Sequence, residues 1–587
     1  MALERGIMLE GSFQGWRVKE ARPLILQELL QNNLAIMYAE PAGYVTSREG
    51  GECIAVLLPI WTIDYGEEAW SSFVENLIQK MHFWDEETRH RFESAVHWLK
   101  EHSFSKAEGI GTRLPWEPEL VIDSLSDATL FPAFGTISHF LSSPQFGALN
   151  NQGGLDGIHP EKMTRQVWDY VFLRGDYPVF CGIPMETLDK LRREFEYWYP
   201  IDFHASGKQN TEKYLIMMLY NHVAIWNCDK SKWPKSIRCL GNVLINNEKM
   251  PRDRPRSWSI DEAVEHWGTD AVRFALADAG DKSMEDGNFE ESVAHTAVQK
   301  LYTQLEWIEE MLKQKNQMRN EAPNSFADQA FDHLISKAII ETDKHYQRTS
   351  YRHVLTSGFF DLQGHRDWYR NAVGGEGLNA GLILRFIEVQ ALLMAPIIPH
   401  WCEYVWGLLG KTGSVRLAPW PQVPPVNNII LKQFIYLQDL IKSLRTRKDN
   451  WNKKSSKQVS KVVLQVAKGF PVWMQMVVEA VRPVFEKTHD PINVRSAVTQ
   501  LWRTQKTLFP DLKKLMSFAV FLEQSFQERG MEALDQQLPF DEKQFLIENA
   551  EYLKRILGLE VVEVVDTDDS EKSKPGQPFA CFFVKVE

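Results

Sequence analysis

Residues 243–280 of the chain read VLINNEKMPRDRPRSWSIDEAVEHWGTDAVRFALADAG, and they carry its most informative pattern. A strand-like run ends at Asn246 and Asn247, and a loop rich in Lys and Arg follows. Ser259 and Glu262 have the Ser-x-x-Glu spacing of a capping box, which predicts that a helix begins there. Because a helix N-terminus carries partial positive charge, cations just before it predict an anion site, with phosphate as the natural ligand. A solvated basic loop is the alternative.

The sequence on either side of this stretch predicts helices and a second sheet. A helix is predicted over residues 184–198, and apolar residues recur at helical spacing from residue 298 to about 412, which predicts a helix bundle. The proline-rich segment 416–426 predicts a linker. Beyond it, residues 462–466, 561–565 and 579–586 predict strands with helices between them, so the C-terminal region is predicted to be a small α+β domain.

Composition places the chain among large globular proteins. Its 587 residues are too many for one core, and 44% hydrophobic and 25% charged residues exclude disorder along most of the length. The net charge of −12 argues against a generally cationic surface for nucleic acid, although a local basic patch stays possible. Six scattered cysteines without a CxxC pair indicate a reduced, cytoplasmic compartment and predict no structural metal site. No segment predicts a membrane span or a signal core.

Several stretches together resemble one family. EKM, WSIDEAVEHWGTDAVRFALADAG and EDGNFEE are similar to the KMSKS region of class I aminoacyl-tRNA synthetases, specifically leucyl-tRNA synthetase of the archaeal and eukaryotic cytosolic type. Seven further stretches match this family in order along essentially the whole chain: DYGEEAW (64–70), GIGTRLPW (109–116), SLSDAT (124–129), VWDYVF (167–172), KLRREFEYWYPID (190–202), LYNHVAIW (219–226) and FIEVQALLMAPIIPHWCEYVW (386–406).

The resemblance implies a fold class of α/β plus all-α. Residues 1–60 are expected to form the end of an editing insertion and the return to the catalytic core, and 61–290 a partial Rossmann-type catalytic domain with the KMSKS-like loop. Residues 291–425 are expected to form the helical anticodon-binding bundle, and 426–587 the small α+β domain with a basic linker. The first Rossmann half and its HIGH motif are absent from this sequence, so the chain is expected to begin within a larger enzyme's architecture.

The same resemblance implies leucyl-tRNA aminoacylation. ATP, with Mg²⁺, activates leucine to leucyl-adenylate, and the leucyl group then moves to the tRNA. Lys249 and Arg252 are the expected catalytic residues, stabilising charge on the phosphates. The ATP-binding residues would be Ser206, Gly207, Lys249, Met250 and Arg252, and those of the amino-acid pocket Trp61, Asp64 and Tyr65.

Four departures from the family pattern fall at substrate-handling positions. HIGH is missing, and in the KMSKS loop Pro251, Arg252 and Asp253 replace Ser, Lys and Ser. Gln209 and Tyr214 stand where the family has Asp and His, and Pro59–Ile60 where it usually has Asp-Gln. Arg252 keeps the charge but not the compact ammonium, and Pro251 stiffens a loop that must close over ATP. The resemblance therefore predicts a ligase-like protein that is impaired or inactive alone. The alternatives are a non-catalytic paralogue that binds tRNA or a protein partner, and one half of a split synthetase completed by a HIGH-bearing polypeptide.

A basic stripe between residues 439 and 468 predicts contacts with RNA phosphates. It follows the segment that the resemblance assigns to tRNA binding, so leucine tRNA is the expected partner. A solvated linker is the alternative. The residues expected to bind tRNA are Lys442, Arg445, Arg447, Lys448, Lys453, Lys454 and Lys457.

Overall fold

The computed structural model describes residues 6–38, 43–47, 50–54, 56, 59–141, 158–249, 258–280, 284–455, 458–488, 494–505, 509, 511–535, 537–567 and 573–584. The chain forms two compact units. The first comprises Met1–Met81, Arg91–Asp202 and Thr211–Lys235, and the second His82–His90, Phe203–Asn210 and Ser236–Glu587. α3 (Glu86–Trp98) contains the division between residues 90 and 91.

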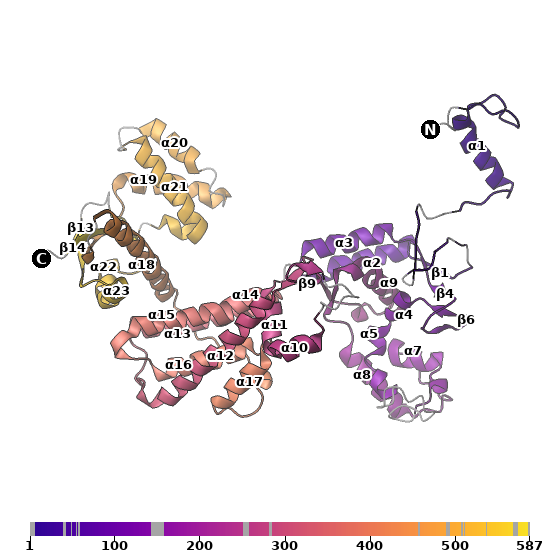
Figure 1. Ribbon diagram of the computed structural model, residues 1–587, viewed down its shortest axis with the longest axis horizontal. Helices are drawn as coiled ribbons and strands as arrows, with labels where there is room; N and C mark the ends of the chain where they lie inside the picture. The colour runs from indigo at the N-terminus through magenta and orange to yellow at the C-terminus, as the bar shows by residue number, and fades with distance from the viewer. Residues whose placement is uncertain are drawn as a thin grey trace. The chain divides into compact units, whose positions relative to one another are not determined.

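Helices packed beside two small antiparallel sheets make up the first unit (Figure 1). β1 pairs with β3, and β6 lies between β4 and β5. The helix predicted over 184–198 is confirmed: α8 follows Pro184, ends at Trp198 and buries Leu188, Leu191 and Phe195. The described helices and strands are α1 (Val18–Gln31), β1 (Thr62–Asp64), α2 (Glu68–Lys80), β3 (Glu101–Ser103), β4 (Ser105–Lys106), β5 (Arg113–Leu114), β6 (Glu117–Ile122), α4 (Ser124–Ala128), α5 (Phe131–Phe134), α6 (Ser138–Leu141), α7 (Arg165–Leu173), α8 (Met185–Trp198) and α9 (Ile216–Ile225).

The second unit contains two three-stranded sheets formed by strands that precede the helix bundle in the chain. In the first, β8 (Ser236–Leu240) lies between β2 (His82–Phe83) and β7 (His204–Gly207), and both pairings are parallel. Ile237 and Cys239 on one face of β8 are fully buried, and Ser236 and Arg238 on the other face are each only 5% exposed, as is usual for a parallel strand covered on both faces. In the second, β9 (Val243–Ile245) pairs with β10 (Glu248–Lys249) as a hairpin and runs parallel to β11 (Gly287–Phe289).

The sequence pattern of residues 243–280 is confirmed in outline. The strand-like run is β9, and Asn246 and Asn247 form the hairpin turn with φ of 49° and 68°, left-handed values that asparagine tolerates. α10 (Ile260–Trp267) begins after Ser259, and both hydrogen bonds of the capping box form. α11 (Thr269–Asp278) follows after Gly268, whose φ is 82°.

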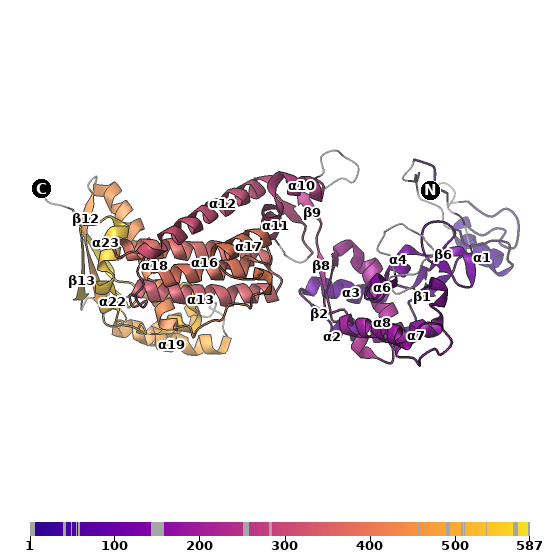
Figure 2. The same ribbon diagram turned by 90° about the horizontal axis from the view of Figure 1, so that it is seen from below.

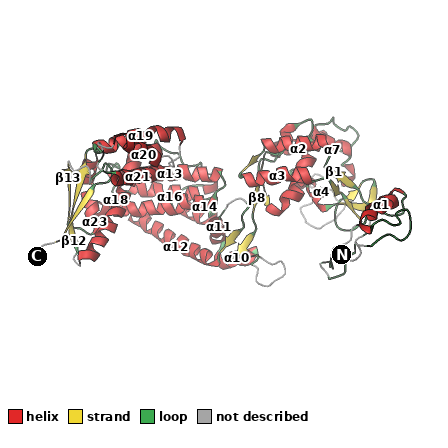
Figure 3. Cartoon of the chain, turned by 90° about the horizontal axis from the view of Figure 1, so that it is seen from above, coloured by secondary structure: helices red, strands yellow, loops and turns green. Residues whose placement is uncertain are grey.

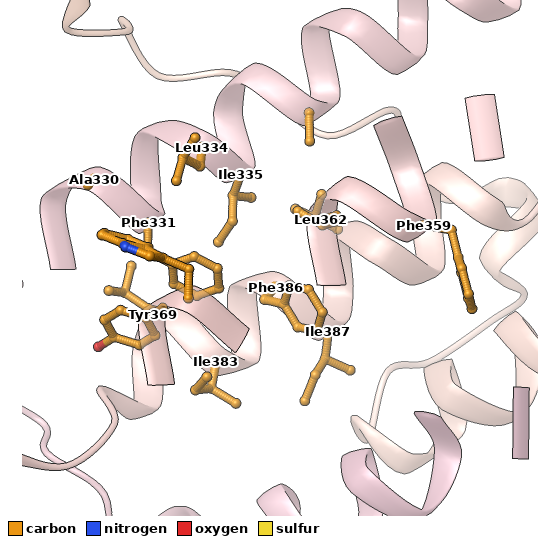
Figure 4. Close-up of a cluster of buried hydrophobic side chains, with 14 of the residues drawn as sticks. Ala330, Phe331, Leu334, Ile335, Phe359, Leu362, Tyr369, Ile383, Phe386 and Ile387 are labelled. Carbon is orange, nitrogen blue, oxygen red and sulfur yellow. The ribbon is translucent and has the colours of Figure 1, made fainter. Parts of the chain in front are cut away.

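The predicted helix bundle is confirmed in the second unit. α13 packs against α15 and α16, and Figures 1 and 2 both show α13 beside α16. Phe331, Tyr369 and Phe386 belong to its core (Figure 4), and the rings of Phe331 and Tyr369 stack with centroids 4.5 Å apart. The bundle helices are α12 (Glu291–Gln314), α13 (Phe326–Gln347), α14 (Tyr351–Leu355), α15 (Leu362–Val373), α16 (Ala380–Met394) and α17 (Pro399–Leu408).

The three predicted C-terminal strands are confirmed as β12 (Val459–Ala467), β13 (Val561–Thr567) and β14 (Phe579–Val584), and Figure 3 shows them in yellow. β12 is central, parallel to β13 and antiparallel to β14. One continuous core joins this sheet, α18 (Asn428–Ser455), α22 (Glu542–Glu548) and α23 (Ala550–Leu557) to the bundle. A separate core holds α19 (Val472–Thr488), α20 (Val494–Gln505) and α21 (Leu512–Arg529) together.

The predicted mixture of α/β and helical parts is therefore confirmed at that level. The predicted domain boundaries at residues 60, 290 and 425 stay predictions.

Candidate functional site

The candidate anion site is built on the hairpin of the second unit. Lys249 is exposed at the end of β10, where the antiparallel pairing of Lys249 with Leu244 positions it. The turn of the hairpin is fastened to the β11–α12 connection: the Asn247 N–H donates to Asn288 Oδ1 at 2.6 Å, and the Glu291 N–H donates to Asn246 Oδ1 at 3.3 Å. The expected ligands Met250 and Arg252, together with Pro251 and Asp253, lie outside the described residues.

Ser206 and Gly207 lie at the carboxyl end of β7, where parallel sheets usually bind ligands. Ser206 Oγ accepts a hydrogen bond from Asn210 Nδ2 at 3.0 Å. Gln209 covers Gly207: a β-carbon built on Gly207 would lie 2.6 Å from Gln209 Nε2. The side chain that replaces the family's aspartate therefore occupies the surface at which a glycine would let a phosphate approach the backbone.

Lys208 ties this strand end to the hairpin. Its ammonium lies 2.6 Å from Asp286 Oδ1 and donates to the Met284 carbonyl at 3.0 Å. Asp286 also accepts from the Asn242 N–H at 2.8 Å, and these bonds to Lys208 and Asn242 hold the pKa of the Asp286 carboxyl below its usual value. Gly241 permits this close approach, because a β-carbon there would collide with the Glu285 carbonyl oxygen.

Sequence reasoning missed this clamp. Asp286 falls in the quoted stretch EDGNFEE, but Lys208 lies 78 positions away and outside the quoted stretches, and one sequence gives no signal that they pair.

In the first unit, the candidate amino-acid site contains two half-exposed indoles. The Trp61 N–H donates to Ser105 Oγ at 2.9 Å and its Nε1 to Glu117 Oε2 at 2.8 Å. Trp61 also meets Trp116 edge to face at 5.5 Å. These bonds orient the Trp61 ring while 45% of the residue stays exposed.

Asp64 and Tyr65 differ from Trp61 in environment. The Asp64 carboxylate accepts from the Gly66 N–H at 2.9 Å, as in a local turn. Tyr65 is fully buried against Trp70 and Tyr220, and desolvation raises its pKa to about 12. At neutral pH Tyr65 therefore carries its proton and can act in this core only as a hydroxyl.

His222 belongs to the core of the first unit. It is fully buried, its Nδ1–H donates to the Met218 carbonyl at 2.7 Å, and its Nε2 accepts from the Tyr199 hydroxyl. Asn221 beside it donates to Thr129 Oγ1 at 2.8 Å. The polar residues of LYNHVAIW therefore join helices rather than face a ligand.

The basic stripe divides into two groups. Arg445 NH2 donates to the Ile556 carbonyl at 3.5 Å and Lys448 Nζ to the Leu557 carbonyl, so both cations lie at the C-terminus of α23, where helix carbonyls attract positive charge. Arg447 NH2 donates to the Ala580 carbonyl of β14 at 3.2 Å. By contrast, Lys442 and Lys453 are exposed on α18. The side chain of Lys454 and all of Lys457 lie outside the described part of the chain.

The described part of the chain shows neither a metal centre nor a membrane span. Among its residues, no group of three His, Cys, Asp or Glu side chains is arranged to hold a metal ion. Within the same residues, no helix combines the length and the apolar character needed to cross a membrane.

Comparison with known proteins shows what this chain is similar to. Residues 328–464, from the bundle through α18 into β12, match the model of the anticodon-binding domain of tRNA ligase. A cytoplasmic leucine–tRNA ligase of Pongo abelii is 37% identical over 595 aligned residues, covering 99% of this chain and 50% of the relative. The chain is homologous to the cytoplasmic leucine–tRNA ligases. Those of Neurospora crassa and Saccharomyces cerevisiae are 35% and 36% identical, over 97% and 92% of this chain.

The chain spans about half the length of the curated relatives it matches, with 50%, 52% and 49% of these three covered. A solved Agrobacterium radiobacter LeuRS–tRNA–LeuAMS complex overlaps it with a TM-score of 0.34 and 16% identity, covering 47% of this chain and 32% of that one.

Proposed function

We propose that this chain takes part in leucyl-tRNA aminoacylation in the cytoplasm, as a leucine–tRNA ligase-like protein that binds leucine tRNA. The observation that carries the proposal is the homology to leucine–tRNA ligases over 99% of the chain, with an anticodon-binding domain match across residues 328–464. The parallel sheet β2-β8-β7, and the hairpin β9–β10 that follows β8 in the chain, support assignment of residues 61–290 to a partial Rossmann-type catalytic domain.

In this function Lys249 contacts the phosphates of ATP, together with Arg252 and Met250 of the adjoining loop. The hairpin fixes the backbone of Lys249 by pairing it with Leu244, which sets the point from which its side chain reaches toward a phosphate. Ser206 and Gly207 would face the same nucleotide from the end of β7, and Trp61 and Asp64 would border the leucine site. Tyr65, which has no exposed surface, would contribute to that site only through the core. A Mg²⁺ ion would arrive with ATP, since magnesium is commonly held through substrate phosphates and few protein ligands.

The fit to ATP is incomplete at Gly207. The Gln209 carboxamide lies over the glycine, and it is neutral where the family has a carboxylate. Together with the altered KMSKS loop, this supports low or absent leucine activation by the chain alone. Gln209 also favours a second candidate function, a non-catalytic paralogue that retains tRNA or partner binding. The third candidate is a split synthetase. In it, this chain would be the half that carries the KMSKS-like loop, and another polypeptide would supply the HIGH motif.

ATP–pyrophosphate exchange with leucine separates these arrangements. The first candidate, aminoacylation with weak activation, predicts slow exchange that rises in Gln209→Asp. Rapid exchange by the unaltered chain would contradict impaired activation. No exchange in either form, with retained binding of leucine tRNA, would favour the non-catalytic paralogue. Exchange only after a HIGH-bearing fragment is added would favour the split enzyme. Lys344→Gln, a surface change on α13 with 53% of the lysine side chain exposed, is the matched control.

A further inference from the structure

β14 is an edge strand of the C-terminal sheet. The strand order is β13-β12-β14, so β14 pairs with β12 on one side only. On its other side, Arg447 of α18 donates from NH2 to the Ala580 carbonyl at 3.2 Å. A carbonyl that α18 reaches points away from β12, and the peptide groups of an antiparallel strand alternate in direction, so the N–H and C=O groups of Ala580 and Phe582 lie on the outer edge. Among the described residues, no other backbone group bonds to this edge.

The two edges of this sheet differ in charge. β13 carries Glu563 and Asp566, which pair with Lys461 and Lys543 at 2.6 and 2.5 Å. β14 reads FACFFV over residues 579–584 and has no charged residue. Proteins normally protect an edge strand with charge, proline or a covering element, because its free peptide groups can pair with another strand. In the described part of the chain, the side chain of Arg447 is the one polar group that meets the β14 edge, so this is the side of the sheet that can accept a further strand.

Arg447 gives this edge a cation without an acidic partner. Within the described ranges, no carboxylate lies within ion-pair distance of its guanidinium, which is instead 5.6 and 5.9 Å from the centroids of the Phe579 and Phe582 rings. The Ala580 carbonyl takes one of the five N–H donors of the guanidinium, and a carboxylate is the acceptor that fits the others best. Phe583 adds apolar surface, since 47% of the residue is exposed. The edge is therefore complementary to a strand that carries acidic and apolar side chains.

We propose that β14 binds an extended peptide segment of a protein partner as an added strand, with an acidic side chain of that segment on Arg447 and an apolar one against Phe583. In such strand addition, main-chain hydrogen bonds supply affinity and the alternating side chains supply specificity. The peptide groups of Ala580 and Phe582 would form the main-chain bonds, and Arg447 would turn from the Ala580 carbonyl to the carboxylate. This interaction needs neither leucine nor tRNA, so its test is independent of the proposed function.

The test uses the full chain and a fluorescein-labelled peptide that alternates valine and threonine, with one glutamate at its centre. Fluorescence polarisation should show saturable binding, and the same peptide with lysine at its centre should bind more weakly. Arg447→Gln should weaken binding of the glutamate peptide by roughly 5- to 13-fold, between the upper value for an exposed ion pair and the lower value for a hydrogen bond to a charged group. Lys442→Gln, which removes an exposed cation from the same helix, is the matched control and should bind as the wild type does.

Hydrogen–deuterium exchange shows where the peptide lies. With the glutamate peptide at ten times its dissociation constant, exchange of the Ala580 and Phe582 amides should slow by roughly tenfold, because they exchange only while the peptide is dissociated. Amides of β13, on the opposite edge of the sheet, should exchange as before. Phe583→Ala leaves the main chain of β14 unchanged and should weaken binding by roughly 1.4- to 5-fold, the range for one cross-strand pair of side chains.

Three results would overturn the proposal. The first is equal binding of the glutamate and lysine peptides, or equal losses in Arg447→Gln and Lys442→Gln, since binding would then not depend on the cation at the edge. The second is peptide binding without slower exchange at Ala580 and Phe582. The third is no peptide binding by the wild-type chain. In that case, light scattering that shows a dimer in the wild type and a monomer in Phe583→Ala would identify a second copy of the chain as the occupant of the edge.

Discussion

Replacing Asp328 by alanine should destabilise the helix bundle strongly. Asp328 lies in the first turn of α13 with no exposed surface, and its carboxylate accepts two bonds from Arg319, at 2.8 and 3.1 Å, and one from the Tyr369 hydroxyl at 2.5 Å. Asp328→Ala removes the carboxylate that accepts hydrogen bonds from the Arg319 guanidinium and the Tyr369 hydroxyl. Removing one partner of a buried ion pair costs about 3–5 kcal/mol, against about 0–1 kcal/mol for an exposed pair such as Lys344 with Glu341.

Hydrogen–deuterium exchange of the slow amides in α13 and α15 measures this cost. Asp328→Ala should raise their exchange rates by roughly 150- to 5,000-fold, and the control Lys344→Gln by less than about fivefold. Equal effects of the two variants would refute the assignment of Asp328 to a buried pair that stabilises the bundle.

The pH dependence of this pair has a defined sign. Burial alone would raise the pKa of Asp328, but the bonds from Arg319 and Tyr369 outweigh it and hold the pKa below the usual value. The resulting stability is present above the unfolded pKa, near 4, and should be lost as the pH falls through the folded pKa. Asp328→Asn should remove that acid-side loss.

Three other predictions concern particular side chains. Burial raises the pKa of Glu542, so the free energy of unfolding of the wild type, measured in urea, should fall as the pH rises from the unfolded-state pKa toward the folded-state pKa. This pH dependence has the opposite sign to that of Asp328, and Glu542→Gln should remove it. A wild-type free energy of unfolding that rises over this pH range would contradict the prediction. Gly241→Ala should lower the free energy of unfolding, measured by thermal denaturation, by about 1–3 kcal/mol, because its β-carbon would collide with the Glu285 backbone. A β-carbon at Gly364 in α15 meets open space, so Gly364→Ala should be neutral or stabilising. If Gly364→Ala were the more destabilising of the two, the close approach at Gly241 would be contradicted. Lys442→Gln with Lys453→Gln should reduce the salt dependence of tRNA binding by about one unit of slope for each phosphate that these lysines neutralise, and an unchanged slope would remove both from the interface.

Local sequence signals predicted the local structure well. The capping box at Ser259, the helix after Pro184 and the three C-terminal strands depend on short-range spacing, and all of them form. The hairpin turn at Asn246 and Asn247 also follows from residue type, because asparagine tolerates left-handed backbone conformations.

Long-range pairing accounts for what the sequence could not predict. The Lys208–Asp286 clamp joins residues 78 positions apart, and Arg445 and Lys448 reach carbonyls more than 100 positions away. A run of cations is identical in sequence whether its members face RNA or cap a helix end. Only the packing of α18 against α23 shows that Arg445 and Lys448 contact carbonyls at a helix end.

Binding of leucine tRNA by the full chain across a salt series tests the central claim most directly. The account predicts that the logarithm of the association constant falls linearly with the logarithm of salt concentration, and that leucine tRNA binds more tightly than a tRNA for another amino acid. Absence of binding at low salt, or affinity that is independent of salt and of tRNA identity, would contradict it.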